Sequence, residues 1–175
     1  MSLPDYDSPS ALKAILDSRS MAMQKKFGQN FLINANARTK LAESLDLQEG
    51  MKVWEVGPGL GALTTEILKR KANLTAFEID RGFVSFLQEE IQPLYKDSFE
   101  IVSGDVLKTW KDYFVKNGKP DRFFGNLPYN VAAAIVADMI ENELRFDKAV
   151  ITVQKEVALR MAAKPGSDDY SSFSV

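Results

Sequence analysis

Residues 52–64 read KVWEVGPGLGALT, and the expected architecture follows from them. The first five residues form an apolar run typical of a buried strand, and a helical pattern begins near Ala62. Gly57, Gly59 and Gly61 lie between the two. Glycines in such a turn let the backbone approach a ligand closely, and the N-terminus of the next helix faces that ligand. This order of strand, glycine turn and helix predicts a ligand site at the carboxyl edge of an α/β sheet.

Short apolar runs alternate with helical patterns along the rest of the chain. Such alternation predicts an α/β fold with a parallel sheet and helices on both faces. The expected strands are Lys52–Val56, Leu74–Glu78, Phe99–Ser103, Arg122–Gly125 and Ala149–Gln154. Helices are expected after Ser8-Pro9, at Ala35–Leu45 and Lys155–Ala163, and from near Ala62, Arg81, Lys108 and Ala132.

The composition limits the kinds of reaction that the protein can catalyse. The 175 residues are 45% hydrophobic and 26% charged, which suits one domain with a core. No apolar run is long enough to span a bilayer, and residues 1–5 lack the shape of a signal peptide, so we expect a cytoplasmic protein. Cys and His are both absent. We therefore expect no disulfide and no metal site, and any enzyme here must work by positioning, electrostatics or a cofactor.

Charge is distributed unevenly. The net charge of −2 and the pI of about 5.3 argue mildly against a dedicated nucleic-acid binder. Residues 25–40, however, hold four basic side chains and no acidic one, and residues 155–164 hold three basic side chains and one acidic one. Such clusters are usually solvated surface, and they point to nucleic acid only if they flank a nucleotide site.

Acidic residues end the next two expected strands. Glu78 follows Gly57 by 21 positions, where its carboxylate can accept hydrogen bonds from the hydroxyls of a ribose. Asp105 ends the third strand and can accept from an adenine amino group, although a strand-end Asp also caps the following helical turn. These features do not separate NAD from S-adenosylmethionine, because both cofactors carry a ribose. Gly57, Gly59 and Ala62 also match the dinucleotide pattern.

The fourth expected strand distinguishes these cofactors, because Asn126-Leu127-Pro128-Tyr129-Asn130 follows it. The Asn126 oxygen and the next carbonyls can accept both hydrogens of an exocyclic amino group, and Tyr129 can stack on the ring. An ordinary turn is the plain alternative. A dehydrogenase needs a group for the alcohol proton, often a His, whereas methyl transfer to an amine needs no strong base. Methyl transfer is therefore favoured, driven by placement and oriented dipoles.

Seven motifs occur together in one order along the chain. They are Lys26-x-x-Gln29-Asn30-Phe31-Leu32, Glu55–Gly61, Phe77–Asp80, Gly104–Val106, Gly125–Asn130, Gln154–Ala158 and Ala163–Ser167. Over residues 24–175 the set resembles the rRNA adenine N6,N6-dimethyltransferases of the KsgA type. The Asn-Leu-Pro-Tyr element is similar to the signature of methyltransferases that modify the amino nitrogen of adenine.

The resemblance implies a Rossmann-like class I methyltransferase sheet that binds S-adenosylmethionine. It also implies N6,N6-dimethylation of two adjacent adenosines near the 3′ end of 16S rRNA, within immature small ribosomal subunits, by a monomer. Asn126, Pro128 and Tyr129 would be catalytic, with Tyr129 stacking on the target base. The resemblance implies that Asn30 and Leu32 touch the methionine end of the cofactor beside the Gly57 turn, that Glu78 binds the ribose and Asp105 the adenine, and that Asn126 faces both the cofactor and the target amine. Further implied cofactor contacts are Gln29, Gly59, Ile79 and Val106.

The sequence departs from the family pattern in two places. Ser171-Ser172-Phe173-Ser174-Val175 stands where many relatives have a small residue, Arg and Leu before Ser-Val, so one basic contact is missing. Relatives also continue past the position of Val175 with two more strands and a small helical rRNA-binding domain. We therefore expect a truncated sheet, a helical extension at residues 1–24, a catalytic domain at residues 25–175, and poor rRNA methylation by this chain alone.

Three alternatives stay open. An Erm-type methyltransferase of large-subunit 23S rRNA shares most of the motifs. A non-catalytic ribosome-assembly factor could reuse the fold, although the intact Asn126, Pro128 and Tyr129 argue against it. An NAD-dependent oxidoreductase is the remaining alternative and fits the fourth strand poorly.

Overall fold

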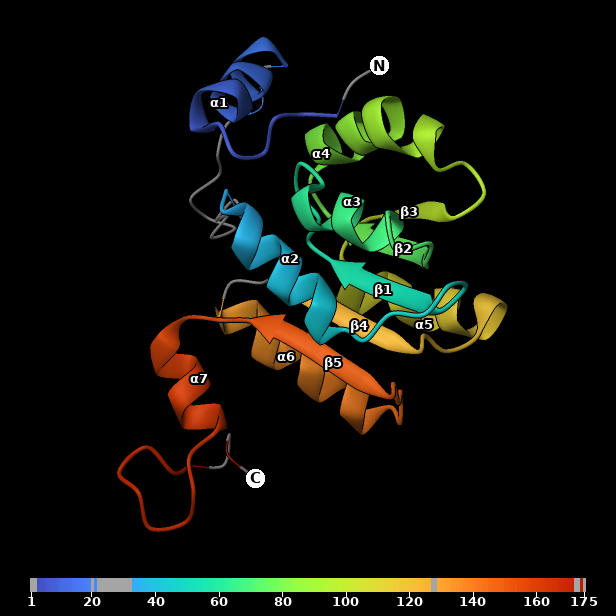
Figure 1. The fold of residues 1–175 in the computed structure, drawn as a ribbon. Coiled ribbons are helices and arrows are strands. Elements are labelled where there is room, and N and C mark those ends of the chain that lie inside the picture. The colour runs from blue at the N-terminus through green and yellow to red at the C-terminus, as the bar shows by residue number, and fades with distance from the viewer. Residues whose placement is uncertain (1–2, 20, 22–32, 127–128, 172–173, 175) are drawn as a thin grey trace.

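Residues 3–19, 21, 33–126, 129–171 and 174 are described by the structure, a computed structural model. At its centre lies a five-stranded sheet in the order β3-β2-β1-β4-β5 (Figure 1). All neighbouring strands pair in parallel, as expected. The strands are β1 (Lys52–Val56), β2 (Asn73–Glu78), β3 (Phe99–Ser103), β4 (Arg122–Asn126) and β5 (Lys148–Thr152).

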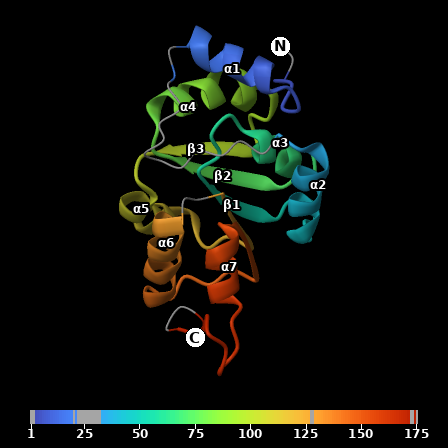
Figure 2. The same ribbon diagram turned by 90° about the vertical axis from the view of Figure 1, so that its left-hand side faces the viewer.

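Helices cover both faces of the sheet, which confirms the expected layers. Figure 2 shows α2 and α3 on one side and α5 and α6 on the other, with α1 beside α4 at one end. The helices are α1 (Pro9–Ser18), α2 (Ala35–Ser44), α3 (Ala62–Leu68), α4 (Arg81–Phe86), α5 (Val106–Asn117), α6 (Tyr129–Glu141) and α7 (Lys155–Met161). A π-helical turn η2 (Leu87–Ile91) and a 3-10 turn η3 (Gln92–Leu94) extend α4.

The alternation of side chains along each strand produces two cores. Val53 points into the first core, among α1 to α4, whereas the next residue, Trp54, points into the second, between the sheet and helices α5 and α6. Phe124 and Phe123 divide in the same way. Both faces of the central strands are therefore apolar, as a buried parallel sheet requires.

Helix α1 packs on the first core. The Ser8 side chain caps its N-terminus by accepting from the Ala11 amide at 3.2 Å, and Pro9 occupies the first turn, as the sequence predicted. Leu12 and Leu16 are buried in the same cluster as Leu63 of α3 and Leu74 of β2. The proposed domain boundary at residue 24 lies outside the described residues.

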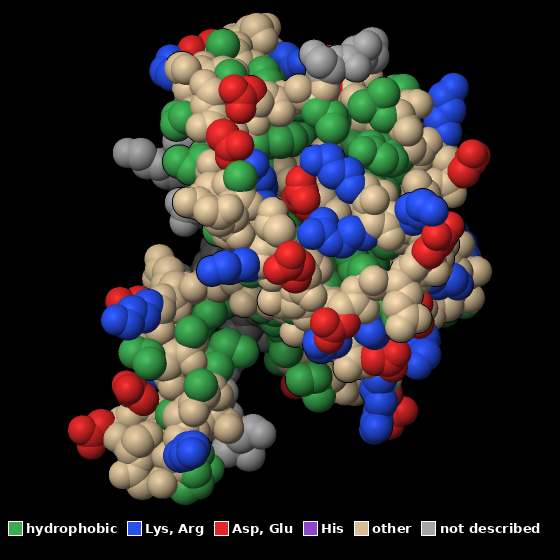
Figure 3. Space-filling model, in the orientation of Figure 1, with side chains coloured by type: hydrophobic (Ala, Val, Ile, Leu, Met, Phe, Trp, Pro, Cys, Tyr) green, Lys and Arg blue, Asp and Glu red, His purple; other side chains and the backbone are tan. Residues whose placement is uncertain are grey.

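The β5 edge of the sheet is only partly covered. Strand β5 pairs only with β4, and its residues are half-buried or exposed. Helix α7 follows it, has no buried residue and projects from the body of the molecule (Figure 1 and Figure 3). Among the described residues, no helix has the length and apolar character needed to cross a membrane.

One carboxyl group lies fully inside the first core. Glu55, in β1, is 1% exposed, and the Thr64 hydroxyl donates a hydrogen bond to its Oε2 at 2.7 Å. Burial raises the pKa of Glu55 to about 8, and the nearby Glu78 carboxylate acts in the same direction. Glu55 is therefore largely protonated at neutral pH, which avoids the large cost of burying a charge.

Replacing Glu55 with Gln should flatten the pH dependence of stability. The folded-state pKa of about 8 lies above the ordinary value of 4.5, so stability falls as pH rises from about 4.5 to 8. The neutral Gln variant lacks this loss, which amounts to roughly 1–4 kcal/mol. Denaturant unfolding at pH 5 and pH 8.5 should show it gaining on the wild type. The exposed Glu49→Gln variant is the control, and equal pH slopes in all three proteins would contradict the assignment.

Candidate active site

The carboxyl ends of the parallel strands lie side by side at one end of the sheet. Val56 pairs with Phe77 on one side and with Gly125 on the other, so Glu78, Gly57 and Asn126 follow at the same level. Adjacent strands lie about 4.8 Å apart, which places the Glu78 and Asn126 backbones roughly 10 Å from each other. The register thus brings together residues that the sequence separates widely.

The turn between β1 and α3 depends on its glycines. Gly57, Gly59 and Gly61 have φ angles of 74°, 57° and 80°. Residues with a Cβ atom rarely adopt this backbone conformation. The Gly57 amide donates to the Phe77 carbonyl at 3.0 Å, so the turn begins against β2. A Cβ on Gly61 would collide with Ile91 Cδ1, so the buried Ile91 side chain would have to move.

Glu78 connects this turn to the loop after β2. The side chain is 5% exposed, and its Oε2 accepts from the Gly59 amide at 3.1 Å while its Oε1 accepts from the Asp80 amide at 2.9 Å. Burial raises the pKa of Glu78, whereas the two amides act in the opposite direction. Each carboxylate oxygen has a second lone pair, so the group can still accept from a pair of ligand hydroxyls. These acceptors fit the two hydroxyls of a ribose.

The remaining predicted cofactor residues lie beside the ends of β2 and β3. Ile79 is 50% exposed next to Glu78, as an apolar side chain that meets a ligand ring would be. Val106 is buried in the second core. The Asp105 side chain caps α5, since its Oδ1 accepts from the Leu107 amide at 3.1 Å. The helix-cap interpretation of Asp105 therefore holds, and its contact with a cofactor adenine stays a prediction.

Asn126 ends β4, and a neighbouring strand orients its side chain. Thr152, its register partner at the end of β5, donates a hydrogen bond from Oγ1 to Asn126 Oδ1 at 2.6 Å. An amide oxygen can accept two hydrogen bonds, so this contact does not prevent acceptance from a substrate amine. The contact does determine that the oxygen of the amide, and not its nitrogen, faces β5.

Several predicted site residues lie outside the described residues. These are Gln29, Asn30 and Leu32 before α2, and Leu127 and Pro128 after β4. The backbone of Tyr129 begins α6, three residues earlier than the sequence predicted. The roles of these residues stay predictions.

Three residues near the site were not foreseen as contributors. Thr152 orients Asn126, Glu55 lies beneath the glycine turn, and Tyr6 donates a hydrogen bond to the Leu60 carbonyl within that turn. Glu55 had a sequence signal, because a carboxyl in a buried strand needs a reason. Thr152 and Tyr6 had none, since each contact joins segments that are distant in sequence. Within the described parts of the chain, no three His, Cys, Asp or Glu side chains gather as metal ligands.

Proteins of known family are similar to this chain in sequence. Residues 21–175 match the model of the family described as ribosomal RNA adenine dimethylase. The ribosomal RNA small subunit methyltransferase A of Treponema denticola is 50% identical over 175 residues, which are 100% of this chain and 60% of that protein. The chain thus spans about three fifths of the length of that relative.

Two solved structures share the fold. A dimethyladenosine transferase from Plasmodium falciparum superposes with a TM-score of 0.69 and 28% identity, covering 81% of this chain and 50% of that one. The 23S rRNA methyltransferase ErmE gives a TM-score of 0.61 and 29% identity, covering 75% and 50%. The Rossmann-like methyltransferase sheet expected from the sequence is confirmed. The chain belongs to the ribosomal RNA adenine dimethylase family.

Proposed function

We propose that this chain carries the catalytic part of an S-adenosylmethionine-dependent rRNA adenine-N6,N6-dimethyltransferase. Its substrates would be two adjacent adenosines near the 3′ end of 16S rRNA in immature small subunits. One observation carries the proposal: Glu78, the Gly57 turn and Asn126 end three adjacent strands in register. The carboxylate that we assign to the ribose and the amide that we assign to the amine thereby belong to residues whose backbones lie roughly 10 Å apart.

The binding half of the site consists of Glu78 and the glycine turn. Glu78 would accept from the ribose hydroxyls of S-adenosylmethionine, and the turn lets the backbone approach the cofactor without Cβ atoms. When bound, S-adenosylmethionine supplies an electrophilic methyl group on a sulfonium. Ile79 offers an apolar surface beside the ribose position.

The reacting half of the site centres on Asn126. Its Oδ1 would accept a hydrogen from the adenine amino group, which orients the nitrogen lone pair towards the cofactor side. Because Thr152 holds the amide, this orientation is set before the substrate arrives. The amino nitrogen loses its proton during or after methylation, so the site needs no strong base. Tyr129 would stack on the base once it is unpaired.

The family assignment narrows the rival functions. The curated relative at 50% identity over the whole chain is named for the small subunit. This likeness supports small-subunit rRNA over an Erm-type substrate. Asn126 at the end of β4 and Tyr129 after it support catalysis over a purely structural role in ribosome assembly. The proposal further includes a monomer that acts in the cytoplasm.

Replacing Glu78 with Gln should weaken S-adenosylmethionine binding about 10–100-fold. The change keeps the side-chain size but removes the charge that strengthens each ribose hydrogen bond, and such bonds contribute roughly 1.5–3 kcal/mol. Calorimetric titration of the folded chain measures the effect, with NAD as the competing cofactor. Glu49→Gln makes the same change at an exposed position and should bind like the wild type. Tight binding of NAD instead would refute the cofactor assignment.

Replacing Thr152 with Val should lower kcat about 10-fold and leave the affinity for S-adenosylmethionine unchanged. Val has nearly the same shape but cannot donate to Asn126, so the amide loses this contact with β5. Thr152→Ser keeps the hydroxyl and should retain most of the wild-type kcat. Single-turnover methylation by the complete gene product gives the rates. A Ser variant as slow as the Val variant would contradict this role of the hydroxyl.

The rRNA substrate can be identified directly. We expect the complete gene product to transfer methyl groups from S-adenosylmethionine to immature small subunits and to form N6,N6-dimethyladenosine at two adjacent positions near the 3′ end of 16S rRNA. Mass spectrometry of nuclease fragments locates the product. Methylation of 23S rRNA alone would support the Erm-type alternative, and cofactor binding without any methylation would support an assembly factor.

A further inference from the structure

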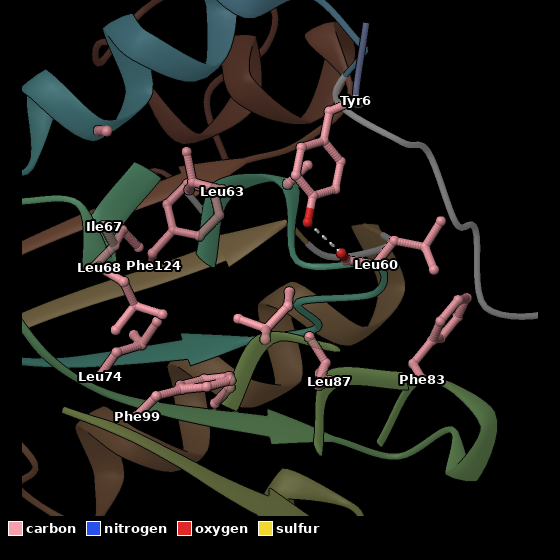
Figure 4. Packing of buried hydrophobic residues seen from close by; sticks show 14 of the residues in the cluster. Tyr6, Leu60, Leu63, Ile67, Leu68, Leu74, Phe83, Leu87, Phe99 and Phe124 are labelled. Atoms are coloured by element: carbon pink, nitrogen blue, oxygen red, sulfur yellow. Dashed lines mark hydrogen bonds between the residues drawn. The ribbon is translucent and has the colours of Figure 1, made fainter. Parts of the chain in front are cut away.

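The segment before α1 reaches the glycine turn. The Tyr6 hydroxyl donates a hydrogen bond to the Leu60 carbonyl at 2.9 Å, across 54 positions of sequence (Figure 4). The Tyr6 side chain is buried and belongs to the same apolar cluster as Leu60 and Leu63. This contact is therefore built into the core and is not a loose surface interaction.

The accepting carbonyl lies at the centre of the turn. Leu60 stands between Gly59 and Gly61, whose backbones both adopt positive φ angles. Glycine has more backbone freedom than other residues, so a turn rich in glycine needs external contacts to hold one conformation. Because a peptide unit is planar, a contact that fixes the Leu60 carbonyl also fixes the direction of the Gly61 amide. Tyr6 is thus placed to rigidify the part of the turn that follows Gly59.

Contacts from α2 help to hold Tyr6 in place. Arg38 of α2 is buried, and its Nη2 donates to Asp7 Oδ1 at 2.8 Å while its guanidinium lies 5.7 Å from the centre of the Tyr6 ring. Burial raises the pKa of Tyr6 above its ordinary value, and the Glu55 carboxyl acts in the same direction. The hydroxyl therefore keeps its proton and remains a donor to the Leu60 carbonyl.

The end of the same segment lies against α4 and η2. A Cβ on Gly82 would lie 2.9 Å from Met21 Cγ, so Met21 packs closely over the start of α4. Arg19 forms ion pairs with Glu89 at 2.7 Å and Glu90 at 2.5 Å, both in η2. The N-terminal segment (residues 3–19 and 21) therefore contacts the glycine turn through Tyr6 and the helical stretch after β2 through Arg19 and Met21.

We propose that Tyr6 is a positioning residue for the cofactor-binding turn, acting through its hydrogen bond to the Leu60 carbonyl. This proposal rests on the proposed function, because it assigns the turn to S-adenosylmethionine. It gives this role to Tyr6 and not to the rest of the N-terminal segment. Tyr6 touches the turn and acts on the ligand only through it.

Two variants that each remove one hydroxyl test the proposal. Tyr6→Phe keeps the ring in the core and deletes only the donor to Leu60. Ser8→Ala deletes the cap of α1, two residues away, without touching the turn. Three quantities are compared with the wild-type chain: the melting temperature, the calorimetric Kd for S-adenosylmethionine, and the rate of amide hydrogen exchange in residues 57–61.

The expected results separate positioning from stability. Tyr6→Phe should raise the Kd at least five-fold and speed amide exchange in residues 57–61 at least five-fold. Ser8→Ala should lower the melting temperature but change the Kd and the exchange rate in the turn by less than two-fold. Tyr6→Phe with a wild-type Kd, or a Kd that follows the melting temperature in both variants, would overturn the proposal.

Failure of the proposed function would look different. A folded wild-type chain that does not bind S-adenosylmethionine would overturn the cofactor assignment itself. The exchange rates need no ligand, so they would still decide whether the Tyr6 hydroxyl holds the turn. Equal exchange in wild type and Tyr6→Phe would overturn that part as well.

Discussion

The hydrogen bond from the Gly59 amide to the buried Glu78 carboxylate is the contact on which the site depends. It joins the turn after β1 to the end of β2, and the Asp80 amide on the other oxygen extends the connection into α4. A carboxylate buried this deeply is costly unless such donors surround it. Exclusion of water makes the burial of the Glu78 charge unfavourable. It also strengthens any hydrogen bond that a ligand hydroxyl donates to this carboxylate.

Two carboxyl groups lie close together beneath this turn, and their surroundings divide their roles. Glu55 faces the first core, has the Thr64 hydroxyl as its described donor, and stays largely protonated near neutral pH. Glu78 accepts hydrogen bonds from two backbone amides and lies beside the position proposed for the cofactor ribose. Nearby carboxyl groups repel each other when both are ionised, so a neutral Glu55 favours the charge on Glu78.

Much of the fold was predictable because its signals are local. Alternating apolar strands and helical patterns indicated all five strands to within two residues, and the glycines after Val56 indicated the turn. The positions of Glu78 and Asn126 at strand ends followed from the same pattern, whereas Asp105 lies two residues after the end of β3. The starts of α5 and α6 were predicted two and three residues too late. Asp105 caps α5 and begins that helix at once, a detail that apolar periodicity does not reveal.

The amino-acid sequence by itself determined the layered sheet, the glycine turn and the order of the motifs, because each depends on residues within one strand, turn or helix. Only the tertiary structure decided which side chains support the site. Tyr6 meets Leu60 across 54 positions, and Thr152 meets Asn126 across 26. Nothing in the local pattern of either residue marks such a contact. It exists because parallel strands and covering helices bring distant segments to the same edge of the sheet.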